Sequence, residues 1–305
     1  MKLRIGYAIS GVITGVILLF SFIWTQPDGK LHIVFCDVGQ GDAVYVRFPD
    51  GRDMVVDGGP NNRVIDCLGR HMPFWDRKID VVMLTHPEKD HLQGLISVFE
   101  RYQVEHFVRS DAANTTEGYV KLMDVLKQRV VDETYITQGD GIDIGAVSLS
   151  FLWPDQSQIA KGNRTSLISM TGGGTQDVLG RSVDHLNDFS LVFVLRYGDF
   201  DVLFTGDADI RVEKQYVGWN FGGQADDGVE VLKVPHHGSR TGMSEAFVQW
   251  VNPELSIISV GKNSYGHPTK EAMDMLQSIG SRIMRTDEFG DIAVISDGTN
   301  WRIEH

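Results

Sequence analysis

Short apolar runs separated by polar, turn-rich segments make up the chain after residue 30, and they predict a strand-rich body. Ile79 to Leu84 is a nearly continuous apolar run, which is typical of a strand buried on both faces of a sheet. Helical spacing of apolar residues occurs at Arg63 to His71 and at Leu92 to Tyr102. Further apolar runs predict strands over Leu31 to Val38, Ala43 to Phe48, Met54 to Val56, Val104 to Val108, Thr134 to Thr137 and Val147 to Leu152.

The second half of the chain repeats this pattern. Ser190 to Tyr197 and Asp201 to Phe204 predict a hairpin, and Val229 to Val234 and Leu255 to Ser259 predict two further strands. The stretch Pro154 to Asn187 between the halves is polar and holds three consecutive glycines, so we expect an exposed excursion there. Two similar halves predict an α/β or α+β fold in which two sheets face each other and helices lie outside.

Residues Ile5 to Trp24 form an uncharged apolar run that predicts a transmembrane helix. At 1.5 Å per residue such a run spans about 30 Å, the thickness of the hydrocarbon core of a bilayer. Lys2 and Arg4 precede it, which places the N-terminus in the cytoplasm and the body outside. We therefore expect a signal anchor over residues 1–26 and an extracytoplasmic domain over residues 27–305.

A cleaved signal peptide is the alternative interpretation of this segment. The residues after the apolar run, from Trp24 to Gly29, lack the small residues that a signal peptidase needs, which favours an uncleaved anchor. Gly11 and Gly15 are spaced so that two such helices could approach closely, and they raise the hypothesis of a homodimer through this helix.

The net charge and the cysteine content limit the functions that suit this chain. The formal charge of -13 argues against a broadly basic nucleic-acid-binding surface, because phosphate binding normally requires an excess of Lys and Arg. Cys36 and Cys67 both stand among apolar residues, so we expect buried free thiols in preference to a disulfide or zinc ligands.

Four potential metal ligands follow the buried strand within six residues: His86, Glu88, Asp90 and His91. They stand at the carboxyl end of that strand, which is where α/β folds build their sites. The alternative is a simple polar loop in which Asp90 caps the following helix. That explanation suits one such residue but not four, so we expect a metal site.

Three strands of the second half also end in ligand-type side chains. Asp207 follows the hairpin, His236 and His237 follow the next strand, and His267 comes after the last one, each beside glycines. If the strand continued through the two adjacent histidines, they would face opposite sides, and one of them would be structural. The sequence leaves open which of the two is the ligand.

Taken together, these motifs resemble the metallo-β-lactamase superfamily, in its branch similar to the hydrolase domain of the DNA-uptake protein ComEC. The resemblance is carried in order by CDVGQGDAVYVRFPDG, VVDGG, HPEKDH, NDFSLVFVLRYGDFDVLFTGDAD, VLKVPHHGS and ISVGKNSYGHP, within Leu31 to Ile303. It implies a four-layer αββα sandwich with a metal site along one edge between the sheets. The resemblance does not extend to the multi-helix membrane channel of the full uptake protein.

Carried over position by position, the resemblance implies a site for two divalent ions that activate a shared water for attack on a phosphodiester. The implied ligands are His86, Glu88, Asp90, His91, Asp207 and His237, with His236 as the alternative to His237. Most members of the superfamily have a histidine in place of Glu88. A carboxylate there suits Mn²⁺ or Mg²⁺, and Zn²⁺ also accepts oxygen ligands.

Other residues have supporting roles in this scheme. Asp90 would orient the water and take its proton, and His267 would donate to the leaving oxygen or bind a phosphate. Asp57 in VVDGG is expected to cap a turn or orient a ligand histidine from behind. Asp188 or Asn187 would stand in for the lone histidine that many relatives carry at this position. The candidate substrate contacts are Ser239, Lys262 and His236.

The expected function is that of a membrane-anchored, metal-dependent phosphodiesterase or nuclease, with DNA as the first substrate to consider. A phosphodiesterase for cell-envelope or small nucleotide substrates is a second hypothesis, which the acidic charge and the anchor fit equally well. A non-catalytic module that binds nucleic acid at the cell surface is a third. β-Lactam hydrolysis is disfavoured, because Glu88 and the missing central histidine remove ligands on which zinc lactamases depend.

Overall fold

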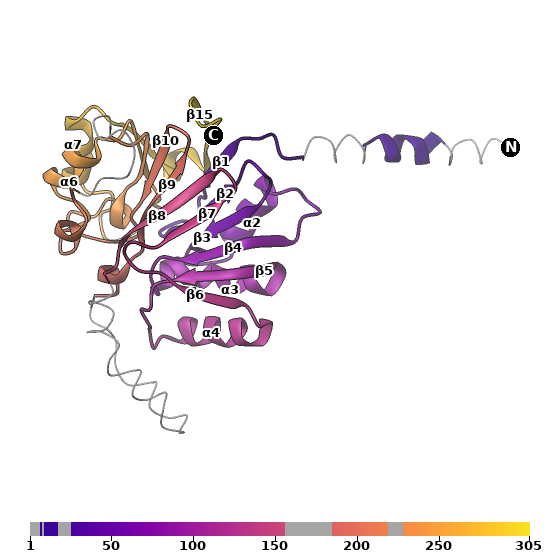
Figure 1. Cartoon of the computed structure of the whole chain (residues 1–305), viewed down its shortest axis with the longest axis horizontal. Helices are drawn as coiled ribbons and strands as arrows, with labels where there is room; N and C mark the ends of the chain where they lie inside the picture. Colours follow the sequence, from indigo (N-terminus) through magenta and orange to yellow (C-terminus); the bar gives the residue numbers. More distant parts are fainter. Residues whose placement is uncertain (1–6, 8, 18–25, 156–184, 219–227) are drawn as a thin grey trace, which may run out of the picture.

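The computed structural model describes residues 7, 9–17, 26–155, 185–218 and 228–305. Two β-sheets pack face to face, with helices against their outer faces (Figure 1). The expected αββα layering is confirmed.

The first sheet has eight strands in the order β15-β14-β1-β2-β3-β4-β5-β6. Strands β3 to β6 run parallel to one another, so their carboxyl ends meet at one edge. The strands are β1 (Leu31–Phe35), β2 (Val44–Arg47), β3 (Asp53–Val56), β4 (Lys78–Leu84), β5 (Gln103–Arg109), β6 (Asp132–Tyr135), β14 (Ile292–Ser296) and β15 (Trp301–Glu304).

The second sheet has seven strands in the order β13-β12-β11-β10-β9-β8-β7. Strands β10 to β13 are parallel, and their carboxyl ends again share an edge. The strands are β7 (Gly141–Ile144), β8 (Val147–Trp153), β9 (Val192–Tyr197), β10 (Phe200–Phe204), β11 (Val231–Lys233), β12 (Leu255–Ile258) and β13 (Arg282–Arg285).

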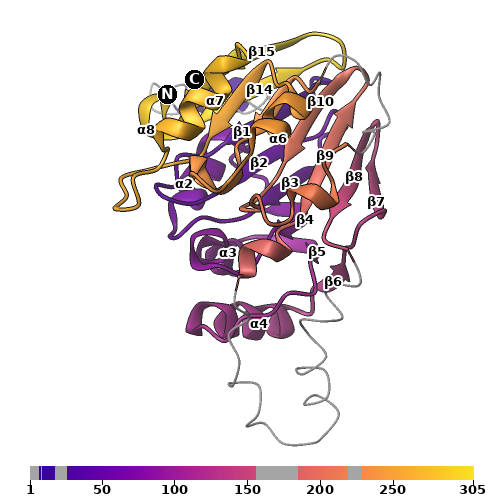
Figure 2. The ribbon, with the colours of Figure 1, turned by 90° about the vertical axis from the view of Figure 1, so that its left-hand side faces the viewer.

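Helices α2 (Arg63–His71), α3 (Lys89–Arg101) and α4 (Glu117–Arg129) pack on the first sheet, and α6 (Glu245–Val251) and α7 (Lys270–Ser278) pack on the second. Figure 2 shows α3 and α4 together at one end of the molecule, away from α6 and α7. The short elements are α8 (Thr286–Phe289), η1 (Leu186–Phe189), η2 (Glu213–Gln215) and η3 (Pro235–Gly238).

The central core lies between the two sheets and follows from the alternation of side chains along each strand. Phe193 and Phe204 stack with their ring centroids 4.7 Å apart, and Phe35 of the first sheet meets Phe204 at 6.2 Å. The alternate residues of the same strands point outward and form two further cores with the helices. The central strands of each sheet are thus buried on both faces, as the near-continuous apolar runs predict.

The expectation of two free thiols is wrong. Cys36, directly after β1, and Cys67, on the sheet-facing side of α2, form a disulfide with their Cα atoms 5.9 Å apart. Both side chains lie in the core that α2 shares with the first sheet. The apolar surroundings that favour a thiol equally bury a disulfide once the fold brings the two residues together.

The expected anchor over residues 1–26 lies mostly outside the described residues. Within the part of the chain that the structure describes, none of the helices is long and apolar enough to cross a bilayer. Most of the expected excursion Pro154 to Asn187 also lies outside the described residues.

Candidate metal centre

The carboxyl end of β4 supplies the first histidine of the site. His86 is fully buried, and its Nδ1 lies 3.1 Å from the Thr85 hydroxyl. Thr85 is itself held by Asp57, whose carboxylate accepts hydrogen bonds from the Thr85 backbone N–H at 2.8 Å and from its hydroxyl at 2.7 Å. Asp57, in the turn that follows β3, therefore fixes Thr85, which in turn contacts the His86 ring.

Helix α3 begins at Lys89, three residues earlier than expected, so Asp90 and His91 lie in its first turn. Asp90 does not cap this helix: the N-cap residue is Glu88, and no side chain makes a capping hydrogen bond. His91 donates from Nδ1 to the Asp57 carboxylate at 2.8 Å, and its Nε2 faces Asp207 Oδ1 at 3.3 Å.

Two glycines explain how α3 comes so close to the turn after β3. A Cβ on Gly94 would lie 1.9 Å from the carbonyl oxygen of Gly58, and a Cβ on Gly58 would lie 2.4 Å from the backbone nitrogen of Leu95. The Gly58 N–H donates to the His91 carbonyl at 2.6 Å. Backbone packs on backbone here, which brings the His91 ring against Asp57.

The second sheet contributes the remaining ligands from the ends of its parallel strands. Asp207 follows β10, and its backbone N–H donates to the Ser190 hydroxyl at 3.2 Å. His237 lies in η3 after β11 with a φ of 54°, a left-handed conformation that turns the chain sharply away from the strand. Its Nδ1 donates to the carbonyl of Ser259 at 2.9 Å, which directs Nε2 toward the opposite sheet.

Four side chains from the two sheets converge: Asp90, His91, Asp207 and His237 have ligand-type atoms within 4.8 Å of one another. His237 Nε2 lies 3.4 Å from both the Asp90 and the Asp207 carboxylates. Three buried atoms of the cluster have no hydrogen-bond partner among the described residues, namely His91 Nε2, His237 Nε2 and Asp207 Oδ1. Buried polar atoms without partners are costly, so this donor set fits a bound cation.

The electrostatics of the cluster favour the same conclusion. Burial alone would lower the pKa of His91 and His237, but Asp207, together with Asp57 for His91 and Asp42 for His237, raises the pKa of both well above the ordinary value. The two imidazoles hold the pKa of Asp207 well below its usual range, despite its burial. Positive charge is therefore stabilised at this point, and a divalent ion would supply it without protonating the histidines.

His86 and Glu88 border this group of four. The His86 ring centroid is 4.1 Å from that of His91, and its buried Nε2 has no hydrogen-bond partner among the described residues. Burial, with His91 close by, lowers the pKa of His86 to about 3. Burial and the carboxylates of Asp207 and Asp90 raise the pKa of Glu88. Both side chains are thus placed to complete a metal centre, and their role as ligands stays a prediction.

The structure separates the two adjacent histidines into different surroundings. His237 is buried inside the cluster, whereas His236 is half-buried, with Nε2 3.9 Å from Asp207 Oδ2 and 3.5 Å from the Asn187 amide nitrogen. The ring of His267 faces that of His236 at a centroid distance of 5.6 Å. His236 and His267 therefore lie together at the rim of the site, beside the proposed ligands.

Other predicted site residues lie outside this cluster. Asp188 forms an ion pair with Arg211 at 3.1 Å, and its neighbour Asn187 is the residue that reaches His236. The Ser239 hydroxyl lies 3.3 Å from the Thr241 hydroxyl and stabilises a local turn. Lys262 is exposed. Their proposed parts in substrate binding or ligand support stay predictions.

Two buried groups behind the ligands were not identified as partners from the sequence. Lys233 of β11 and Asp42 form an ion pair, and the Asp42 carboxylate also lies 3.4 Å from His237 Nδ1. A charged residue within the apolar strand VLKVP was the available signal, because a lysine in a buried strand requires a buried partner.

Comparison with known proteins identifies the family to which this chain belongs. The sequence profile of the metallo-beta-lactamase superfamily matches residues 36–262, which include all the residues of the cluster. The chain belongs to the metallo-beta-lactamase superfamily. The resemblance seen in the sequence is thereby confirmed, and proteins of this fold bind divalent metals, usually zinc.

Relatives of this metallo-beta-lactamase chain include two larger proteins. ComE operon protein 3 of Bacillus subtilis is 26% identical over 297 residues, covering 92% of this chain and 34% of the relative. Competence protein ComA of Neisseria gonorrhoeae is 26% identical over 285 residues, covering 90% of this chain and 34% of the relative. The chain thus spans about a third of the length of these curated relatives.

A solved structure shares the metallo-beta-lactamase fold. YhfI from Bacillus subtilis superposes with a TM-score of 0.53 at 10% sequence identity, over 87% of this chain and 100% of YhfI. At that identity the likeness shows the fold alone.

Proposed function

We propose that this chain is a metal-dependent phosphodiesterase that cleaves DNA. The observation that carries the proposal is the convergence of Asp90, His91, Asp207 and His237 on one point, where three of their buried atoms have no hydrogen-bond partner within the described part of the chain. Divalent ions held there would lower the pKa of a water and stabilise the charge that develops at phosphorus. Mn²⁺, Zn²⁺ and Mg²⁺ are the candidates, since the donors are both imidazole and carboxylate.

The side chains around the cluster suit distinct steps of such a reaction. Asp90 is the most exposed of the four, with 31% of its side chain accessible, so it can both touch an attacking water and receive its proton. We assign His267, at the rim, the protonation of the leaving oxygen. Burial and the nearby His236 lower the pKa of His267.

DNA is proposed as the substrate because of the relatives. One is named for the ComE operon and the other is named a competence protein, and each match covers at least 90% of this chain. The formal charge of -13 favours a second candidate, a phosphodiesterase for small nucleotides or cell-envelope esters, which need no extended basic surface. The two substrates differ in salt dependence, since DNA binding weakens steeply as salt rises.

We propose further that the domain is held outside the cytoplasm by the apolar segment Ile5 to Trp24. The uncharged length of the segment and its flanking Lys2 and Arg4 support this orientation. The disulfide between Cys36 and Cys67 supports it independently, because disulfides persist in oxidising compartments.

The test is cleavage of single-stranded DNA, double-stranded DNA and bis-p-nitrophenyl phosphate by the full chain in detergent with each metal in turn. Asp90→Ala is expected to abolish turnover without changing the far-UV circular dichroism. Asp274→Ala, an exposed carboxylate on α7, is the matched control and should retain activity.

Each outcome decides between the hypotheses. DNA cleavage that is lost only in Asp90→Ala supports the nuclease. Cleavage of the small ester alone rejects DNA and supports the second candidate. No turnover with any metal, in a folded protein, contradicts the enzyme and supports a non-catalytic binding module.

A further inference from the structure

We propose that the edge of the first sheet opposite the metal centre docks on an anionic membrane surface. This inference goes beyond the proposed reaction, and it rests on the proposed anchoring of Ile5 to Trp24. It commits to one partner, the headgroup region of a bilayer that contains acidic lipids. The argument has three parts: where the chain enters the body, which side chains lie at that edge, and how they are charged.

The chain enters the body at the edge where β4 and β5 begin. Pro27 packs on the β2–β3 turn, where a Cβ on Gly51 would lie 2.5 Å from its ring. At the start of β3, the Asp53 N–H donates to Asp80 of β4 at 2.9 Å. The first residue of β4, Lys78, is paired in register with Gln103 of β5. His86 and Asp57, which belong to the metal centre, follow the other ends of β4 and β3.

This geometry would bring the edge close to the bilayer. If the apolar run ends at Trp24 in the interface, Pro27 follows within about 10 Å of extended chain. The starts of β4 and β5 lie two to three strand spacings farther along, at roughly 10 to 15 Å. The edge can therefore reach the headgroups, while the metal centre faces the aqueous side.

Exposed apolar side chains gather at this edge. Phe74 and Trp75, in the loop before β4, are 62% and 39% exposed and form an edge-to-face pair at 4.7 Å. Val130, at the carboxyl end of α4, is 87% exposed. Large aromatic side chains on a loop tip are costly in water, and they are favoured at the membrane interface.

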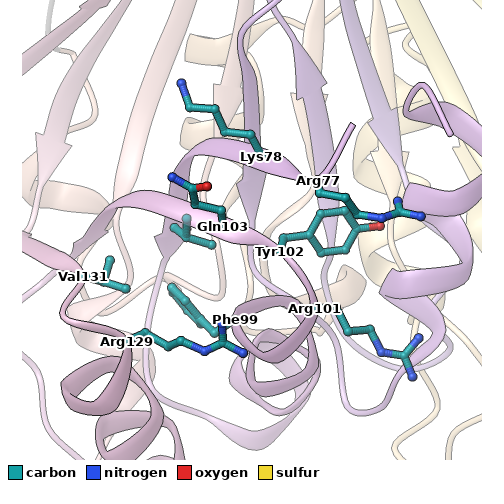
Figure 3. A pocket seen from close by; sticks show the side chains of 9 residues that line it. Arg77, Lys78, Phe99, Arg101, Tyr102, Gln103, Arg129 and Val131 are labelled. Carbon is teal, nitrogen blue, oxygen red and sulfur yellow. The ribbon is translucent and has the colours of Figure 1, made fainter. Parts of the chain in front are cut away.

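Three arginines, Arg77, Arg101 and Arg129, are among the residues that line a hollow of about 450 Å³ at this edge (Figure 3). Arg77 lies over the Tyr102 ring at 5.9 Å, and Arg129 donates to the Glu100 carbonyl at 2.7 Å. Arg101 stands at the end of α3. Among the residues that the structure describes, none of the three forms an ion pair with a carboxylate.

Acidic side chains, Asp76 among them, also lie at this edge. Asp80 and Glu105 share Lys78 as their partner, each at 2.9 Å. Glu100 is 3.9 Å from Lys121. In a chain with a formal charge of -13, three arginines that form no ion pair within the described ranges, close to exposed aromatic residues, fit phosphate headgroups, which attract cations near the surface.

The experiment places the full chain in vesicles of phosphatidylcholine with or without phosphatidylglycerol and measures tryptophan quenching by lipids brominated near the headgroup. Trp75→Phe, measured in parallel, isolates the signal of Trp75 from that of the other tryptophans. We expect Trp75 to be quenched in the acidic vesicles. The variant Arg77→Gln/Arg101→Gln/Arg129→Gln should lose more than half of this quenching.

Lys270→Glu is the matched control, since this exposed lysine lies on α7, just after the His267 loop. It should leave the quenching unchanged. Trp75 that is unquenched, or equally quenched in the triple variant, overturns the proposal. A response of Trp75 to an added DNA oligonucleotide instead of lipid also overturns it and makes the edge a nucleic-acid contact.

Flotation of the same vesicles separates docking from anchoring. A chain that floats without Trp75 quenching is anchored but not docked, so only the present inference fails. A chain that does not float refutes both the anchor and the docking. DNA cleavage is measured in detergent and tests the proposed reaction independently of either result.

Discussion

Lys233 of β11 and Asp42, which precedes β2, form an ion pair buried directly behind the candidate metal centre. Both side chains are almost fully inaccessible, at 2% and 3% exposure. The Asp42 carboxylate also lies 3.4 Å from His237 Nδ1, and the Asp42 N–H donates to the Asp90 carbonyl at 3.1 Å. The pair therefore connects a strand of the second sheet to ligands on both sheets.

Removing the lysine should leave an uncompensated charge in the core. We expect Lys233→Met to lower the free energy of unfolding by about 3 to 5 kcal/mol, measured by urea denaturation. The double variant Lys233→Met/Asp42→Asn removes both charges and should recover part of this loss. If Lys233→Met and the double variant are equally unstable, Asp42 is not the charge that the loss of Lys233 leaves unpaired.

Asp57 and Asp188 were both expected to support ligands, and the structure distinguishes them. Asp57 accepts a hydrogen bond from His91, whereas Asp188 pairs with Arg211. Asp57→Asn should weaken metal binding by roughly 10- to 100-fold, as measured by calorimetric titration with Mn²⁺ or Zn²⁺. Asp188→Asn should bind metal like the unmodified chain, and equal losses in the two variants would refute this distinction.

Asp53 should make stability depend on pH. Burial raises the pKa of Asp53 to about 7, although its carboxylate accepts a hydrogen bond from the Tyr45 hydroxyl at 2.6 Å. The pKa in the unfolded chain is about 3.9, so the folded state holds the proton more tightly. The resulting stabilisation is complete below about pH 4 and is lost as the pH rises to 7.

The comparison with Asp53→Asn isolates this effect from other titrating groups. Relative to the variant, the unmodified chain should lose up to about 4 kcal/mol of unfolding free energy between pH 4 and pH 7 and nothing further above it. The measurement is urea unfolding of both proteins across this range. A difference that does not change with pH would show that Asp53 titrates normally.

The disulfide between Cys36 and Cys67 joins residues 31 apart in the sequence. Constraining a loop of that length stabilises the folded state by about 3 to 4 kcal/mol in the chain-entropy description. Reduction of the unmodified chain and the variant Cys36→Ala/Cys67→Ala should cause similar losses in urea unfolding. Thiol titration of the denatured, unreduced protein should find no free thiol, and two free thiols would reject the bond.

Much of the fold could be predicted from the sequence where burial leaves a periodic signal. The helix expected at Arg63 to His71 matches α2 residue for residue, and the run Ile79 to Leu84 lies within β4. These elements are buried on the face or faces that the apolar pattern indicates. The metal-ligand motifs could also be located, because strand ends followed by glycines, histidines and aspartates combine two independent signals.

The remainder depended on contacts between distant segments. Helix α4 was not predicted because it buries few apolar side chains, among them Tyr119, Leu122 and Leu126. Strand β6 was expected at Thr134 to Thr137 but runs from Asp132 to Tyr135, because it is exposed along its whole length and shows no alternation that would fix its bounds. The disulfide, the Lys233 ion pair and the turn of Asp188 toward Arg211 each require knowledge of which elements become neighbours.

The order of strands in the first sheet has a consequence for how that sheet is completed. Strands β14 and β15 come after every residue of the metal cluster in the sequence, yet β14 pairs with β1 in the sheet that carries His86 and His91. A nascent chain that has emerged only as far as Asp291 therefore contains every ligand while β1 still has an open edge. The sheet behind the ligands is therefore completed only when β14 pairs with β1, so its last pairing step joins segments from opposite ends of the fold.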